Sequence, residues 1–517
     1  MNTKRSVLPR RALRRERMNA AAGSRVLHIA AALGLAAAAA APAGAEIRLR
    51  FTPGETVALE VGTDALRQSF TLADVNNDGV PDLVAVALDA EDEDAIAVLI
   101  NRGDGTFESP RYFTDPEADL LAPAAVAVAD VGSVGAGPAD GNPDVVAVTT
   151  DGFVIPAFGD GAGDFQIASA DERFDLSDVT EGDLVAVVSG EFDGGSGSDV
   201  AVLDDAGFVF FLCNTGPAVF DLCPTAVLDT EGENPSAIGI GNLNGDASPD
   251  IAVLNQGPLG GGPGSVALFL GGSDGTFSKS ALPAVAVGRP DATDLAVGRI
   301  DGDALDDVVV TFVEPLGGDS VQVLSGQGGG VLMAHPVVTG LSFFPAAVAI
   351  ADFDQDGIND LVSPQGDADA FSAIMKGDGL GGFEQVGVPG TRTGTGTAVA
   401  AADLDQDGFP DFVVLRSEGD QLPVAINASG EMPTPTASAM PTASRPPTAT
   451  PTVPATRTGT ATVTETPAPT STPTRDDGDD ADGCVIQPRA HRGGFSLLLL
   501  PAVVLFRRAQ RRRSCRG

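Results

Sequence analysis

The sequence predicts an all-β protein: a seven-bladed β-propeller of four-stranded antiparallel blades, closed by an N-terminal strand and followed by a disordered Pro/Thr-rich stalk. Three observations favour this fold class. A unit of apolar strand, acidic turn and second apolar strand occurs seven times between residues 70 and 415. Its period is 51 to 61 residues, which is typical of solenoids, propellers and arrays rather than of independent domains. Each unit also has room for four short strands, as in a propeller blade.

The acidic turn is the most informative part of the unit. Its clearest copies are 74–82, 352–360 and 403–411, which read Asp-x-Asp/Asn-x-Asp-Gly-x-x-Asp. Oxygen ligands on alternate residues, a sixth-position glycine and a ninth-position carboxylate suit a loop folded around calcium, which takes roughly 6–8 oxygens. We therefore expect calcium as the cofactor. With a weaker fourth unit included, the candidate metal residues are Asp74, Asn76, Asp78, Val80, Asp82, Asn242, Asn244, Asp246, Asp250, Asp352, Asp354, Asp356, Ile358, Asp360, Asp403, Asp405, Asp407, Phe409 and Asp411.

The other four copies depart from this pattern. The fourth places Ala247 where glycine is expected, and the second is stretched by a Gly-rich insert between Asp130 and Asp140. The third lacks a ligand at Gly195. In the fifth, Arg299 replaces the first ligand, and its guanidinium could stand in for the ion. An EF-hand is a poor alternative because it needs flanking helices and a glutamate at position twelve.

The segments around each turn predict the strands of a blade. Short apolar runs bounded by turn residues, such as 347–351 and 411–415, are typical of buried strands. A third strand, for example 95–100, leads into a glycine-aspartate turn closed by phenylalanine, which joins antiparallel strands. The seventh unit stops after its third strand at 423–427. Residues 47–61 can supply the missing outer strand, so that the ring closes and no sheet edge is left exposed.

Taken together, these units resemble the FG-GAP/VCBS repeats of integrin-type propellers. The resemblance covers about 70–430 and is most specific in units one, six and seven. It implies a calcium-stabilised seven-bladed propeller, often found in secreted or surface proteins that act in adhesion or ligand binding. Units three and five lack parts of the motif, so their metal sites are doubtful.

The ends of the chain indicate export. Residues 1–45 have an arginine-rich start and an apolar run, typical of a secretory signal cleaved after Ala45, with Met1 or Met18 as the start. We expect the propeller at 46–430 and a Pro/Thr-rich stalk with an acidic linker at 431–483. The tail 484–517 has Cys484, an apolar run and an arginine cluster, and it resembles MYXO-CTERM sorting signals. That resemblance implies anchoring at the outer membrane of a Gram-negative-type bacterium; a weak membrane tail is the alternative.

Cysteine usage fits such a compartment. Cys213 and Cys223 bracket a short segment where the third and fourth strands of a blade should meet. A disulfide across this hairpin suits an oxidising environment, and two free core cysteines are the alternative.

Charge and composition limit the function. The chain has 71 acidic against 31 basic residues, a formal net charge of −40. Such a surface repels nucleic acid and anionic membranes, so we expect membrane contact only through the tail. The chain has three histidines, and no catalytic constellation can be assembled around His335, the one histidine in the propeller region.

We therefore expect a monomeric adhesion or macromolecule-binding module whose partner is an extracellular protein or glycan. The loops opposite the calcium turns are the candidate ligand face, because variable loops on a rigid scaffold often carry recognition. Phe343, Phe344 and Arg392 are its candidate contacts. The alternatives are a polysaccharide- or phosphoester-active extracellular enzyme and a structural surface-coat protein.

Overall fold

The computed structural model describes fifteen segments of the chain. These are residues 49–59, 69–89, 93–114, 123–134, 139–195, 197–214, 220–258, 262–281, 284–290, 292–313, 320–339, 345–364, 372–386, 396–416 and 421–429. They form strands β1 to β31 and contain no helix. Within these segments there is accordingly no helix of the length and apolar character needed to cross a membrane.

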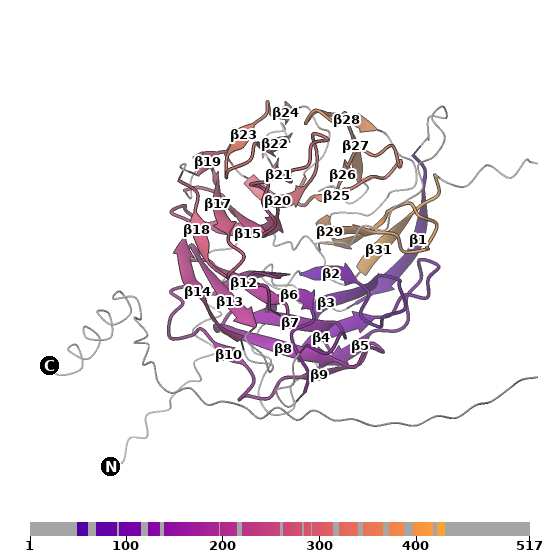
Figure 1. Ribbon diagram of the computed structural model, residues 1–517. Helices are drawn as coiled ribbons and strands as arrows, with labels where there is room; N and C mark the ends of the chain where they lie inside the picture. Colours follow the sequence, from indigo (N-terminus) through magenta and orange to yellow (C-terminus); the bar gives the residue numbers. More distant parts are fainter. Residues whose placement is uncertain are drawn as a thin grey trace, which may run out of the picture. The chain divides into compact units, whose positions relative to one another are not determined.

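Seven separate antiparallel sheets follow one another around a ring (Figure 1). Blade 1 contains β2 (Phe70–Ala73), β3 (Asp82–Leu88), β4 (Asp94–Leu99) and β5 (Arg111–Phe113). Blade 2 contains β6 (Pro123–Ala129), β7 (Asp144–Thr149), β8 (Phe153–Gly159), β9 (Phe165–Ile167) and β10 (Phe174–Asp175). Blade 3 contains β11 (Leu184–Gly190), β12 (Asp199–Asp204), β13 (Phe208–Asn214) and β14 (Phe220–Asp229).

The second half of the ring repeats this plan. Blade 4 contains β15 (Pro235–Gly241), β16 (Asp250–Asn255), β17 (Ser265–Gly271), β18 (Phe277–Lys279) and β19 (Val285–Ala286). Blade 5 contains β20 (Ala292–Gly298), β21 (Asp307–Phe312), β22 (Ser320–Gly326), β23 (Leu332–Ala334) and β24 (Val338–Thr339). Blade 6 contains β25 (Ala349–Ala351), β26 (Asp360–Ser363), β27 (Ala373–Gly377) and β28 (Phe383–Val386). Blade 7 contains β29 (Gly396–Ala402), β30 (Asp411–Arg416), β31 (Gln421–Asn427) and β1 (Phe51–Ala58).

Three blades carry a divided outer strand. In blades 2, 4 and 5 two short segments pair with the same third strand, for example β9 and β10 with β8. Counting each divided strand once gives four strands in every blade. The predicted fold class, seven four-stranded antiparallel blades, is thereby confirmed.

The ring is closed by the N-terminal strand, as predicted. β1 pairs antiparallel with β31, from Phe51 opposite Asn427 to Ala58 opposite Gln421. Figure 1 shows β1, in indigo, beside β31, near the yellow end of the colour scale. Phe51 is buried, and its ring centroid lies 5.1 Å from that of Phe412 and 5.9 Å from that of Phe353. The closing strand is therefore held by side-chain packing as well as by its hydrogen bonds.

The hydrophobic core lies between neighbouring blades. One cluster joins Val84 and Val98 of blade 1 to Val126 and Val145 of blade 2. Another joins blade 7 to blade 1 across the closing seam. Because both faces of a blade are covered by its neighbours, the second and third strands are apolar on consecutive residues rather than on alternate ones, as in β3 (DLVAVAL).

Candidate metal centre

The ninth-position aspartate of each acidic turn is fully buried. It is the first residue of the second strand, and its exposed fraction is 0% in all seven blades. In every blade one carboxylate oxygen accepts a hydrogen bond from the backbone N–H of the second turn residue. The other oxygen accepts from a backbone N–H at the end of the third strand. The seven aspartates are Asp82, Asp144, Asp199, Asp250, Asp307, Asp360 and Asp411.

Blade 7 shows the arrangement clearly. Asp411 Oδ2 accepts from Leu404 N at 2.8 Å, and Asp411 Oδ1 accepts from Asn427 N at 2.6 Å. The same bonds are present in blades 3 and 5, whose turns lack part of the motif. The ninth-position aspartate therefore joins the acidic turn to the third strand in every blade, whether or not the turn can hold a metal.

Burial of these carboxylates raises their pKa. The pKa of Asp82 rises to about 6, that of Asp360 to about 7 and that of Asp411 to about 8. The largest cause is loss of hydration on burial, which backbone hydrogen bonds partly offset. Neighbouring turn carboxylates, such as Asp405 beside Asp411, raise the pKa further. A bound cation would counter this repulsion.

Among the turns whose sixth residue the structure describes, there are two backbone conformations. In blades 1, 2, 6 and 7 the sixth-position glycine has a positive φ, between 86° and 92°. The first-position aspartate then accepts the N–H of this glycine: Asp74 Oδ2 from Gly79 N and Asp352 Oδ2 from Gly357 N, both at 2.8 Å. The long insert of blade 2 does not prevent this, because Asp130 Oδ2 accepts from Gly141 N at 2.8 Å. This curled form brings alternate side chains toward one centre.

Blades 4 and 5 take the second conformation. Their sixth positions, Ala247 and Ala304, are not among the residues with positive φ. In blade 4 the amide of Asn244 lies among the acids, because its Nδ2 donates to Asp246 Oδ2 at 2.8 Å and to Asp250 Oδ1 at 3.1 Å. The predicted residues of this turn do come together, but an amide group of the chain already bridges two of its carboxylates.

Arg299, the first residue of the blade 5 turn, pairs with another residue of that turn. Its ion pair is with Asp306, at 3.7 Å, and its side chain is 61% exposed. Asp306 belongs to the same turn, so the guanidinium lies beside one of its acids, and its role as a substitute for the ion stays a prediction.

Blade 7 offers the donor set that best fits a calcium ion. Ligand oxygens of Asp403, Asp405 and Asp411 lie within 4.8 Å of one another. Asp403 Oδ1 is buried and accepts no hydrogen bond from the described residues. An orphaned carboxylate oxygen among other acids is the environment that a hard cation with oxygen ligands satisfies. These residues therefore fit a calcium ion.

The turns are tied to the neighbouring blade through its glycine-aspartate hairpin. Gly105 N of blade 1 donates to Leu404 O of blade 7 at 3.0 Å, and Asn101 Nδ2 donates to the same carbonyl at 2.9 Å. Gly275 N donates to Phe192 O at 2.9 Å in the same way between blades 4 and 3. These contacts place the acidic turns and the glycine-aspartate hairpins on the same face of the ring. Each turn therefore acts at a seam between blades.

Comparison with known proteins agrees with this architecture. Residues 74–133 and 352–414 match the family described as FG-GAP-like repeat. Each of these two segments carries an FG-GAP-like repeat. No curated protein matches the sequence.

Similar solved structures include BBS1N in complex with ARL6DN, at 12% identity and TM-score 0.47, covering 74% of this chain and 98% of that chain. The BP39L lectin from Burkholderia pseudomallei is 16% identical, with a TM-score of 0.47 and coverage of 72% and 98%. The WD40 domain of Toxoplasma gondii coronin is 10% identical, with a TM-score of 0.48 and coverage of 73% and 86%.

The FG-GAP-like turn of blade 6 brings a lysine among its acids, which the sequence analysis missed. Ligand oxygens of Asp352, Asp354 and Asp356 cluster within 4.8 Å. Lys376 Nζ forms ion pairs with Asp354 and with Asp356, the latter at 2.9 Å. Lys376 lies 22 residues after Asp354 and 20 residues after Asp356 in the sequence. Only the pairing of β26 with β27 could have pointed to this contact.

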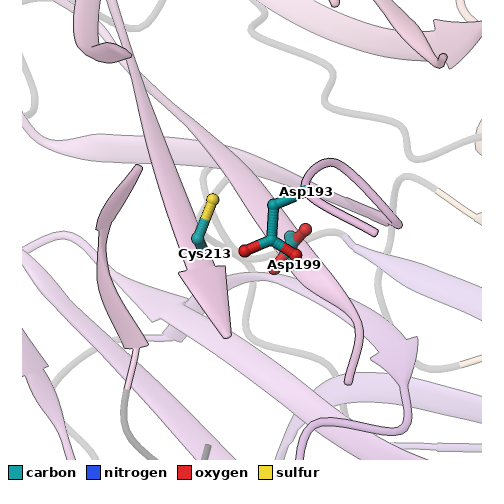
Figure 2. A group of neighbouring side chains, drawn as sticks. All are labelled: Asp193, Asp199 and Cys213. Atoms are coloured by element: carbon teal, nitrogen blue, oxygen red, sulfur yellow. The ribbon is translucent and has the colours of Figure 1, made fainter. Parts of the chain in front are cut away.

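Blade 3 brings Asp193, Asp199 and Cys213 together. Figure 2 shows the two carboxylates side by side, with Cys213 on the neighbouring strand. Cys213 is bonded to Cys223 by a disulfide across the β13–β14 hairpin, so its sulfur is not a thiolate that could bind a metal. Blade 3, whose acidic turn lacks a ligand at Gly195, therefore has a disulfide next to that turn.

Several predicted residues lie outside the described segments. These are the candidate ligand contacts Phe343, Phe344 and Arg392, and the processing residues Ala45 and Cys484. The signal, stalk and tail regions lie outside them as well. Their predicted roles stay predictions.

Ser325 and His335 form a contact that resembles a catalytic serine–histidine pair. Ser325 Oγ lies 2.8 Å from His335 Nε2. Ser325 is 0% exposed, however, so a substrate could not reach its hydroxyl. We interpret the contact as structural.

Proposed function

We propose that this protein is an exported, surface-anchored binding module whose propeller is stabilised by calcium and whose partner is an extracellular protein or glycan. The observation that carries the calcium part is the blade 7 cluster. Asp403, Asp405 and Asp411 converge there, and a buried oxygen of Asp403 has no hydrogen bond from the described residues. Export and anchoring rest on the sequence at both ends of the chain.

Calcium at this position would act on the closing seam of the ring. The Leu404 carbonyl next to Asp403 accepts hydrogen bonds from Gly105 and Asn101 of blade 1. Burial and the nearby Asp405 carboxylate raise the pKa of Asp403, which indicates repulsion that a divalent ion would relieve. Weak affinity is sufficient outside the cell, since extracellular calcium modules bind with dissociation constants of about 10⁻⁴–10⁻³ M.

A closed ring of this kind is a rigid support for recognition. Most residues of the second and third strands are buried, and the hairpins bond to neighbouring turns, so one face is occupied by contacts within the ring. The described connections from second to third strands, residues 150–152 and 205–207, lie at the other end of their blades. Loops carried by a rigid scaffold are common sites of binding.

Calcium titration of the full chain tests the metal part. We expect bound calcium at millimolar concentration and a higher Tm in calcium than in chelator. Asp405→Asn should remove one bound ion and most of the Tm gain that this ion provides. Asp303→Asn is the matched control, because it changes an exposed acid in the blade 5 turn, whose first position is Arg299. Unchanged calcium binding in Asp405→Asn would contradict the assignment.

Binding and catalysis are separated by a second assay. The full chain is tested for retention on immobilised glycans and extracellular proteins, and for turnover of glycans and phosphoesters. Saturable retention without turnover supports a binding module. Turnover that a single carboxylate substitution abolishes would favour the enzyme alternative.

A further inference from the structure

The residue that precedes the third-strand N–H donor to the ninth-position aspartate lies at the acidic-turn end of its blade. Its place is fixed by the hydrogen bond of the next residue, since Asn101 N, Gly377 N and Asn427 N each donate to Oδ1 of their ninth-position aspartate. The preceding residues are therefore equivalent: Ile100 in blade 1, Leu270 in blade 4, Lys376 in blade 6 and Ile426 in blade 7.

In blade 7 this position is apolar and packs between the turn and the next blade. A Cβ placed on Gly105 would lie 2.4 Å from Ile426 Cδ1 and 3.9 Å from Asp405 Cβ. Ile426 therefore packs against the blade 7 turn and brings no charge to it. Blade 6 has the same curled turn but replaces this apolar residue with a cation.

The four carboxylates of the blade 6 turn divide into two pairs. Asp352 accepts from the N–H groups of Asp356 and Gly357, and Asp360 accepts from Phe353 and Gly377. The chain's own backbone thus satisfies the first and ninth positions.

The remaining pair, Asp354 and Asp356, forms ion pairs with Lys376, and Asp356 Oδ1 also accepts from Ile358 N at 2.9 Å. The Asp354 side chain is 4% exposed, whereas that of Lys376 is 37% exposed, so the lysine reaches inward from the rim of the blade. A buried charge without a partner is costly, and this ion pair supplies the partner.

We propose that Lys376 is the resident cation of the blade 6 turn and excludes calcium from it. Blade 6 is then stabilised without metal, and the calcium that the protein binds is held by other turns, blade 7 foremost. The inference rests on the proposed calcium binding of the curled turns. Calcium would have to displace the ammonium from Asp354 and Asp356, and extracellular calcium sites bind weakly, at about 10⁻⁴–10⁻³ M, so little binding free energy is available for that displacement.

The turn beneath the lysine keeps the features of a calcium site. Its sixth residue, Gly357, has a φ of 87°, as in blades 1 and 7. Asp354 Oδ1 is buried and accepts no hydrogen bond from the described residues, like Asp403 Oδ1 in blade 7. Removal of the ammonium should therefore create a calcium site rather than destroy the turn.

Calcium stoichiometry of the full chain, measured by equilibrium dialysis and calorimetry, tests this inference. In the otherwise natural sequence, Asp356→Asn should leave the number of bound ions unchanged. Lys376→Met, which restores an apolar residue at this position, should bind one ion more. The double variant Lys376→Met/Asp356→Asn should lose that gain, and Lys376→Arg should show no gain because it keeps the charge.

Thermal stability provides an independent reading that also shows whether the variants fold. Lys376→Met should melt lower than the natural protein in chelator and recover when calcium is added. The inference is overturned if Asp356→Asn alone loses a bound ion, or if Lys376→Met gains none. Failure of the proposed function gives a different result, in which the natural protein binds no calcium and Asp405→Asn changes nothing.

Discussion

Asp307 of blade 5 allows the structural role of the ninth-position aspartate to be separated from metal binding. Its carboxylate is 0% exposed and accepts from Ile300 N at 2.7 Å, Asp301 N at 3.1 Å and Gly326 N at 2.9 Å. Asp307→Ala leaves these donors without their acceptor. Two of them are buried, and a buried N–H without a partner costs about 1–3 kcal/mol, so we expect a loss of about 2–6 kcal/mol.

This loss should appear as a lower Tm in both calcium and chelator. The unfolding entropy is about 2.1 cal/mol/K per residue, so over roughly 380 residues a loss of about 0.8 kcal/mol lowers the Tm by one degree. The expected loss of about 2–6 kcal/mol therefore lowers the Tm by about 3–8 °C. Calorimetry of the full chain measures it. Asp303→Ala is the control, because Asp303 is exposed in the same turn and its substitution should cost less than about 1 kcal/mol. A shift for Asp307→Ala no larger than that of the control, or one seen only in calcium, would refute the reasoning.

Three further predictions address the disulfide, the ring closure and the effect of pH. Cys213→Ser/Cys223→Ser should lower stability by about 2–3 kcal/mol at this short separation of 10 residues, equally with and without calcium, as measured by calorimetry. Phe51→Ala should cost about 3–5 kcal/mol and lower the Tm, because it empties a buried site against Phe412; an unchanged Tm would speak against closure through β1. In chelator the Tm should fall as pH rises from about 4 to about 8, because Asp411, with its pKa raised to about 8, holds a proton in the folded state that the unfolded chain has released. Asp411→Asn should flatten that slope, and a Tm that rises over this range would contradict the assignment.

The fold was predictable because its signals are local and repeated. Each unit carries its own strands and turn, and seven copies at one period specify a ring. The outer strand of blade 7 was also predictable, because the segment around Phe51 precedes the first unit and has no acidic turn of its own. β1 fills that place beside β31.

The candidate site was predictable only in part. Spacing identified the curled turns of blades 1, 6 and 7, where the oxygens and the glycine lie within nine residues. It did not reveal that the ninth-position aspartate also bonds to the third strand, since Asp411 and Asn427 meet only when the blade is folded. Nor did it reveal that Asn244 bridges two acids of the blade 4 turn.

The sequence by itself determined the number of blades, the position of each acidic turn and the strand that closes the ring. These depend on residue order over short distances, which the chain displays directly. The tertiary structure decided which third-strand side chain lies beside the acidic turn in blades 6 and 7. Ile426 lies against the turn of blade 7, and Lys376 lies against the turn of blade 6. The physical reason is strand pairing, because it places a third-strand residue beside carboxylates that stand about twenty positions earlier in the sequence.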